Sequence, residues 1–171
     1  ETVYMLAHGF STAALFLVVG FMIERRGSAR IEAFGGVQKL TPWLAGVFLF
    51  SGLSALSLPG TSSFVGEFLV LAGAWQRHPI MTAIATLGMV LAALYVLLAY
   101  QRTMTGPVSE QAEKHFTRDL DLRERLVIAP LIILILAFGV FPRPVTHALD
   151  DSAKAIMSAT GMTDPMPGGN R

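Results

Sequence analysis

The chain has 171 residues, of which 53% are hydrophobic and only 15% carry a formal charge. Soluble domains carry about 25% charged residues, so this composition excludes a disordered chain and a nucleic-acid-binding domain, both of which need charge. The formal net charge of +1 creates no overall electrostatic field that would attract anionic partners. The absence of cysteine excludes disulfides and thiolate metal sites in this chain.

Charge-free segments along the chain predict transmembrane helices. Residues 2–23 contain no Asp, Glu, Lys or Arg, and at about 1.5 Å per residue they extend roughly 33 Å, enough for a bilayer core of about 30 Å. Residues 79–101 are also free of formal charge, and residues 126–141 form a further apolar run. These segments lack the polar face of a soluble amphipathic helix. We therefore predict helices over about 2–23, 79–101 and 125–141.

Residues 42–75 form another apolar stretch, which is interrupted in its middle. There, Pro59 removes an amide donor and clashes with the preceding turn, while Gly60 loosens the backbone further. The stretch divides into half-segments at about 42–57 and 62–75. These form either one crossing with an unwound middle or a hairpin of two short crossings.

The positive charges favour the first of these two arrangements. With one broken crossing, the loops 24–41 and 102–125 share a side and carry nine Lys and Arg residues, against four on the other side. A hairpin changes this split to eight against five. The positive-inside rule favours the larger asymmetry. We therefore predict four crossings, with both loops cytoplasmic and the C-terminus outside.

The C-terminal tail, residues 142–171, is punctuated by Pro and Gly, and residues 145–159 fit a short amphipathic helix at the membrane interface. The predicted fold is an all-α integral membrane protein with four transmembrane helices, the second broken at Pro59-Gly60, and a short C-terminal interfacial tail. The chain starts with Glu1, and no signal-peptide pattern is visible at the first span. We expect the C-terminal helical segment of a longer subunit.

Glu67 is the one formally charged residue between positions 40 and 76. A charged side chain at the bilayer centre costs roughly 2.5–3.5 kcal/mol on insertion scales, and intramembrane carboxylates are functional by default. A carboxyl group in such surroundings favours its neutral form and exchanges protons with its neighbours. We interpret Glu67 as a proton carrier. The alternative is a neutral or ion-paired side chain that fixes helix packing, with any basic partner supplied from outside this chain.

His8 is the second candidate, because an imidazole titrates close to neutral pH and suits a proton relay. Tyr4, His8 and Thr12 follow at intervals of four residues and share one helix face, with Ser11 beside them. We predict a polar stripe that relays protons if it faces Glu67. The alternative is that His8 bonds a carbonyl or hydroxyl group between helices.

The predicted break frees backbone carbonyl and amide groups, which at membrane depth are tolerated only inside protein or beside a wet cavity. Broken helices of this kind mark ion and substrate sites in transporters. Ser57, Thr61 and Ser63 are the predicted supporting residues, and Ser63 lies one turn before Glu67. The alternative is a kink that only improves packing. No metal-ligand or phosphate-binding pattern is present, so we predict no cofactor in this chain.

Three motifs carry a resemblance to a known family: AHGFSTAALF at 7–16, ERR at 24–26 and LPGTSSFVGEFL at 58–69. They resemble the antiporter-like proton-translocating subunits of respiratory complex I, and among these the M type of bacterial NADH-quinone oxidoreductase, the mitochondrial subunit 4 type. The likeness covers the whole chain as the last four of that family's fourteen helices. Sister subunits and antiporter relatives commonly carry Lys at the position of Glu67.

The resemblance implies that Glu67 is the terminal protonatable residue near the exit of a proton half-channel, and that His8 belongs to a hydrated central axis. It implies a multi-pass location in the cell (inner) membrane, with the lipid bilayer and other membrane-arm subunits of complex I as partners. Flavin and iron–sulfur clusters then belong to redox subunits elsewhere, and the family's upstream Glu and Lys residues are absent from this chain. The alternative functions are a sodium/proton antiporter component and a non-catalytic membrane anchor.

Overall fold

The computed structural model describes residues 2–161, and within that range it contains helices and connecting segments but no strand. The predicted all-α class is therefore confirmed for the described residues. The elements in chain order are α1 (Thr2–Arg26), η1 (Ile31–Ala33), η2 (Val37–Lys39), α2 (Pro42–Ala55), α3 (Ser62–Trp75), α4 (Pro79–Met104), α5 (Glu110–His115), α6 (Leu122–Val140) and α7 (Arg143–Thr160).

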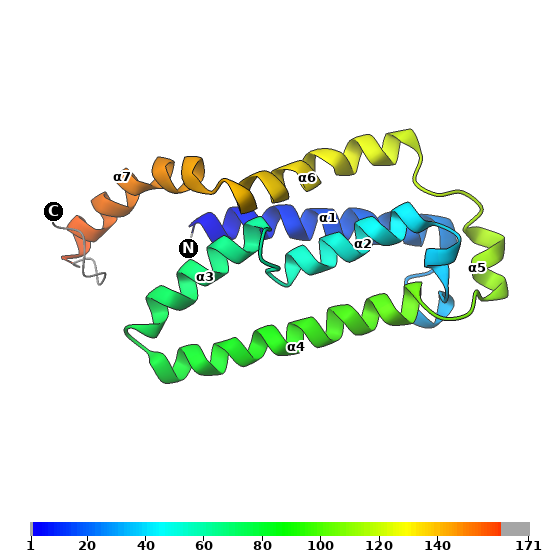
Figure 1. The fold of residues 1–171 in the computed structure, drawn as a ribbon, viewed down its shortest axis with the longest axis horizontal. Coiled ribbons are helices and arrows are strands. Elements are labelled where there is room, and N and C mark those ends of the chain that lie inside the picture. Colours follow the sequence, from blue (N-terminus) through cyan, green and yellow to red (C-terminus); the bar gives the residue numbers. More distant parts are fainter. Residues whose placement is uncertain (1, 162–171) are drawn as a thin grey trace.

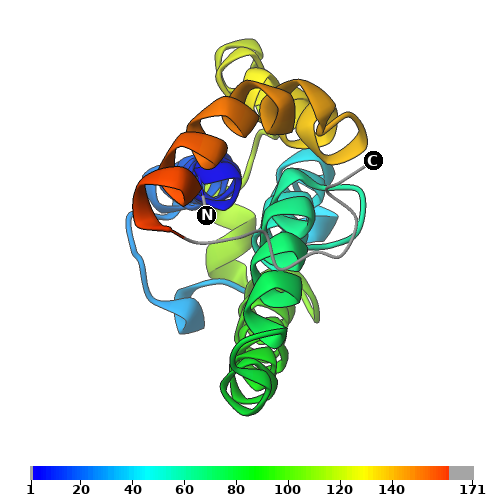
Figure 2. The same cartoon turned by 90° about the vertical axis from the view of Figure 1, so that its left-hand side faces the viewer.

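The long helices run alongside one another, and the chain reverses direction between them (Figure 1). Helix α1 contacts α2, α3 and α6, whereas α4 contacts α2 and α3. Viewed from the end, α4 and α6 lie at opposite edges with α1 between them (Figure 2). The connections 27–41 and 105–121 lie together at the end that carries α5 (Figure 1). The two loops that are predicted to be cytoplasmic therefore lie at one end of the molecule.

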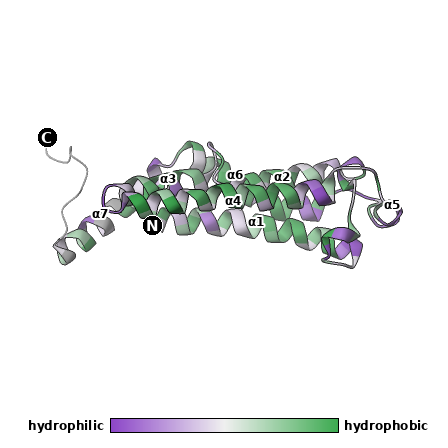
Figure 3. Ribbon diagram, turned by 90° about the horizontal axis from the view of Figure 1, so that it is seen from below, coloured by the Kyte–Doolittle hydropathy of each residue, from purple (hydrophilic) through white to green (hydrophobic). Residues whose placement is uncertain are grey.

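Two of the described helices, α1 and α4, are long and apolar enough to span a membrane, and the bent pair α6–α7 is a further candidate. Helices α2 and α3 are shorter and also apolar. Large hydrophobic side chains such as Ile84, Leu87 and Leu91 remain exposed on α4. Hydrophobic residues follow the long helices, and hydrophilic ones gather near α5 (Figure 3). The chain therefore has the surface of a membrane-integral protein.

The helices extend beyond the charge-free segments at the end that carries α5. Helix α1 continues to Arg26, α4 continues to Met104, and α6 begins at Leu122. The start of α6 is set by a capping box: the Glu124 N–H donates to Asp121 Oδ1 (2.8 Å) and the Asp121 N–H donates to Glu124 Oε2 (2.9 Å). A criterion based on charge ends these segments too early, because α1 and α4 continue through Arg25, Arg26 and Arg102 and the capping groups of α6 are charged.

Helices α2 and α3 follow one another end to end and are separated by residues 56–61 (Figure 1). Ser57 and Gly60 adopt φ values of 57° and 96°, and Pro59 has no N–H to donate. The Thr61 hydroxyl closes the turn by donating to the Leu58 carbonyl (2.7 Å). The structure thus contains the predicted break, and the end-to-end arrangement does not fit the alternative of a hairpin.

Helix α7 follows α6 at an angle of 76°. It is amphipathic, it has proline in its first turn, and it ends where Gly161 adopts a left-handed φ of 64°. The helix predicted over 145–159 is therefore present and slightly longer. Residues 162–171 of the predicted tail lie outside the described residues.

Candidate functional site

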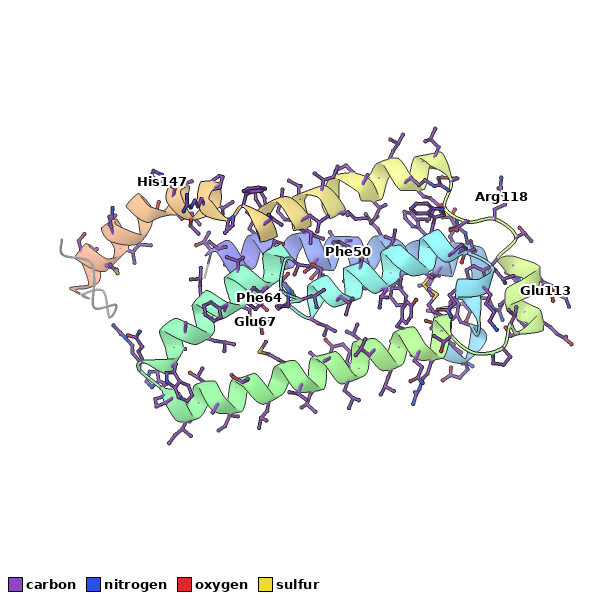
Figure 4. The ribbon with its side chains drawn as sticks, viewed as in Figure 1. Phe50, Phe64, Glu67, Glu113, Arg118 and His147 are labelled. Carbon is purple, nitrogen blue, oxygen red and sulfur yellow. The ribbon has the colours of Figure 1, made fainter. Side chains whose placement is uncertain are left out.

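A recess of about 240 Å³ opens between α1, α2, α3 and α4. Its titratable groups come from three helices: Tyr4 and His8 from α1, Glu67 from α3 and Tyr95 from α4. The other lining residues are Ala55, Leu56, Ala85, Gly88, Met89 and Ala92. Glu67 is partly buried and points from α3 into the space between α3 and α4 (Figure 4). The structure therefore brings Glu67 together with the α1 side chains in one recess.

The polar stripe on α1 forms a continuous row. The rings of Tyr4 and His8 stack with their centroids 5.8 Å apart. On the other side of the imidazole, His8 Nε2 lies 3.3 Å from the Thr12 hydroxyl oxygen. The Ser11 hydroxyl donates to the His8 carbonyl (3.1 Å) and is buried. The Tyr4 ring, the His8 ring and the Thr12 hydroxyl thus follow one another along α1, starting at the recess.

Close contact between α1 and α3 sets the position of Glu67. A Cβ atom added at Gly66 would lie 2.6 Å from the Tyr4 Cα atom, so only glycine allows this approach. The next residue is Glu67, which lines the recess together with Tyr4. One turn earlier, the Ser63 hydroxyl donates to the Ser11 hydroxyl across the same interface (3.3 Å, buried). The small residues of α3 therefore hold the carboxyl group against the stripe.

The helix break lies on the side of α3 that faces α6. A Cβ atom added at Gly139 of α6 would overlap the Gly60 carbonyl oxygen and lie 2.6 Å from the Thr61 carbonyl carbon. Ser57 is buried with a left-handed φ, and Thr61 bonds within its own turn. Neither residue lines the recess. The break therefore packs against α6, while Glu67 faces α4.

Tyr95 is the recess residue that sequence reasoning did not select. It lies on α4 within a segment free of formal charge, and its side chain is largely exposed. The available signal was a phenol in the mostly apolar stretch of α4, which also carries Tyr100. Tyr95 reaches the recess only because α4 lies opposite α3. The sequence around Tyr95 does not indicate which helix lies opposite.

A second polar network lies at the other end of the molecule. Two Arg25 nitrogens donate to the two Glu124 carboxylate oxygens at 2.6 Å each, and the side chains are only 15% and 12% exposed. Arg25 also donates to the Asp119 carbonyl (3.2 Å). The Asp119 carboxylate accepts from the Trp43 and Leu44 N–H groups (2.8 and 2.9 Å). This network ties the end of α1 to the starts of α2 and α6.

The comparisons with known proteins place these features in a family. Residues 1–94 match the family described as NADH:quinone oxidoreductase/Mrp antiporter, TM. The chain is 48% identical over 167 residues to NADH-quinone oxidoreductase subunit M of Mycobacterium tuberculosis (98% of this chain, 30% of the relative). It is 40% identical over 153 residues to the protein of the same name from Rickettsia felis (90% and 31%). It is 38% identical over 153 residues to NADH-ubiquinone oxidoreductase chain 4 of Marchantia polymorpha (90% and 31%).

The chain thus spans about 30% of the length of the relatives it matches. The matched residues 1–94 include His8 and Glu67, and the relatives carry the names that the sequence motifs suggested. The resemblance seen in the sequence is therefore confirmed. The chain belongs to the NADH:quinone oxidoreductase/Mrp antiporter family of transmembrane proteins.

Proposed function

We propose that the chain is the C-terminal part of a subunit of NADH-quinone oxidoreductase and translocates protons across the membrane. In this proposal Glu67 is a protonatable channel residue and His8 is a relay. The observation that carries the proposal is the recess. Glu67 lines it together with His8, Tyr4 and Tyr95. The names of the similar proteins supply the reaction to which proton movement is coupled.

The chemistry follows from the groups in the recess. A glutamic acid side chain takes up a proton as it becomes neutral and releases it as it becomes charged. An imidazole accepts a proton at one ring nitrogen and releases one from the other, which suits His8 for passing protons along the stripe. The row of His8 and Thr12 then continues from the recess along the surface of α1.

Energy for the transport comes from outside the chain in this account. Moving one elementary charge against 100 mV requires about 2.3 kcal/mol. Redox subunits that carry flavin and iron–sulfur clusters supply this energy through electrostatic coupling along the membrane arm. Other membrane-arm subunits and the lipid bilayer are then the immediate partners of the chain.

We further propose four crossings of the cell (inner) membrane, made by α1, the broken pair α2–α3, α4 and α6. The loops 24–41 and 102–125 are cytoplasmic, α7 lies at the opposite interface, and the C-terminus is outside. The common end of the two loops and their nine positive charges support this topology. A Gln111→Cys variant should gain reactivity with an impermeant thiol reagent applied from the cytoplasmic side, and His147→Cys with the reagent applied from the outside, each compared with the parent protein.

The Mrp antiporters in the family description support a second candidate, a component of a sodium/proton antiporter. Sodium-dependent transport without quinone reduction would favour it. A third reading, a non-catalytic membrane anchor, predicts that neutral substitutions at both Glu67 and His8 leave pumping intact. Co-purification with flavin- and iron–sulfur-containing subunits would favour the proposed oxidoreductase.

Glu67→Gln tests the proposal in membrane vesicles that contain the assembled enzyme. Proton pumping should fall at least about tenfold, because a glutamine cannot exchange a proton, whereas general acid–base groups contribute 10²–10⁴-fold. Glu113→Gln is the matched control, since Glu113 is an exposed acid on α5 at the far end of the molecule (Figure 4). Pumping at the wild-type rate in Glu67→Gln would contradict the proposal.

A further inference from the structure

An arginine and a tryptophan meet on the outer surface where α2 and α6 begin. The Arg125 guanidinium carbon lies over the Trp43 ring, 5.5 Å from its centre. Arg125 Nε also donates to the Leu120 carbonyl (2.9 Å). These two contacts hold the guanidinium group in one orientation. Both side chains nevertheless face outward, because Arg125 is exposed and Trp43 is 65% exposed.

The other donors of this pair have no partner within the described residues. The two terminal nitrogens of Arg125 and the indole N–H of Trp43 make no hydrogen bond there, and no carboxylate forms an ion pair with Arg125. The neighbouring acids are engaged elsewhere: Glu124 with Arg25, Asp119 with the start of α2, and Asp121 as the cap of α6.

The position of Arg125 favours an anion from outside the described chain. The helix dipole is positive at an N-terminus and opposes a cation in this place. Arg123 is also exposed and adds a second positive charge to the start of α6. A planar guanidinium group binds a phosphate with two parallel hydrogen bonds. A phosphate group is therefore a ligand that fits the unused donors.

The surroundings identify the source of this phosphate as a lipid. Tryptophan in membrane proteins prefers the level of the lipid headgroups. Apolar side chains follow beside Arg125 on the exposed face of α6, at Leu126 and two turns later at Ile133. On α2, a Cβ atom added at Gly46 would meet nothing within 4 Å. A cationic end followed by open apolar surface suits an anionic headgroup with acyl chains, whereas a soluble phosphate would use only the cationic end.

We propose that an anionic phospholipid binds at Trp43 and Arg125. Its phosphate accepts hydrogen bonds from the terminal nitrogens of Arg125 and from the Trp43 indole N–H, and its acyl chains lie on the exposed apolar faces of α2 and α6. The proposed topology places this lipid in the cytoplasmic leaflet. The site is separate from the recess and does not depend on the role of Glu67.

Photoreactive lipids test the site on the assembled enzyme in phosphatidylcholine nanodiscs. Photoreactive phosphatidylglycerol should label the peptides that contain Trp43 and Leu126 about fivefold more than photoreactive phosphatidylcholine, which is the gain from one arginine near anionic lipid. Arg125→Gln should remove this excess. Arg102→Gln is the matched control and should keep the excess, since Arg102 is an exposed arginine near the same end of the molecule, on α4.

Three results would overturn the proposal. They are equal labelling by the two lipids in the wild type, an excess that survives Arg125→Gln, and an excess that inorganic phosphate abolishes, because the last result indicates a site for soluble anions. A peptide that neither lipid labels gives equal values as well, and it indicates that protein covers the site. The comparison of the two lipids in the wild type needs no variant, so it decides even if Arg125→Gln does not assemble.

The lipid site and the proposed function fail separately. Labelling does not require turnover, so Glu67→Gln should retain the excess of phosphatidylglycerol whether or not it pumps protons. Loss of pumping in that variant tests only the role of Glu67, and loss of the excess in Arg125→Gln tests only the lipid site.

Discussion

Gly66 is the point at which α1 and α3 approach most closely around the recess. A Cβ atom at this position would lie 2.6 Å from the Tyr4 Cα atom and 2.9 Å from the Tyr4 Cβ and N atoms. Ordinary van der Waals contact begins at 3.4 Å. Because the nearest atoms are backbone, Gly66→Ala requires α3 to move away from α1 by roughly 1 Å.

Two effects follow from this displacement. Overpacking of this kind costs about 1–3 kcal/mol, so the thermal midpoint of the assembled enzyme should fall. Glu67 moves with the helix and away from Tyr4 and His8, and misplacement by about 1 Å can slow a reaction about 10²-fold. We therefore expect Gly66→Ala to lose proton pumping as well as stability, measured by thermal inactivation and vesicle acidification.

Gly73→Ala is the matched control within the same helix. Gly73 is exposed, and a Cβ atom there meets nothing within 4 Å. Alanine favours a helix over glycine by about 1 kcal/mol, so this variant should be as stable as the wild type or slightly more so. If Gly66→Ala matches Gly73→Ala in both stability and pumping, the reasoning about the α1–α3 contact is refuted.

Three further variants test other parts of the structure. Glu124→Ala leaves the partly buried Arg25 without its anion, which should destabilise the enzyme in thermal inactivation by about 1.5–3 kcal/mol, the range for hydrogen bonds to charged groups. Asp119→Ala removes the cap of α2 and should cost about 1–2 kcal/mol in the same assay; an unchanged midpoint would show that the cap contributes nothing. Tyr95→Phe removes the α4 phenol from the recess and should slow pumping with an unchanged midpoint, and full activity would show that the phenol is not needed.

The sequence predicted those features that depend on neighbours along the chain. Apolar runs locate α1 and α4, because a helix in a membrane is apolar on all sides. The Pro59-Gly60 pair locates the break, since proline lacks an N–H and glycine permits the left-handed turn seen at φ 96°. The interval of four residues from Tyr4 to His8 predicted the stacked stripe on α1.

Features that depend on which helices lie side by side could not be predicted in this way. Tyr95 reaches the recess only because α4 lies opposite α3. The Arg25–Glu124 pair joins residues 99 positions apart, and each residue alone suggests only a solvated charge at a membrane edge. Ser57 and Thr61 were grouped with Glu67 by sequence distance, yet the turn at the break directs them away from the recess.

The central claim is that Glu67 takes up and releases a proton as the enzyme turns over. Infrared difference spectroscopy of the assembled enzyme measures this directly, through the carbonyl stretch that only a protonated carboxyl group gives. The account predicts a turnover-dependent band in the wild type and in Glu113→Gln that is absent in Glu67→Gln. A band that persists unchanged in Glu67→Gln would contradict it.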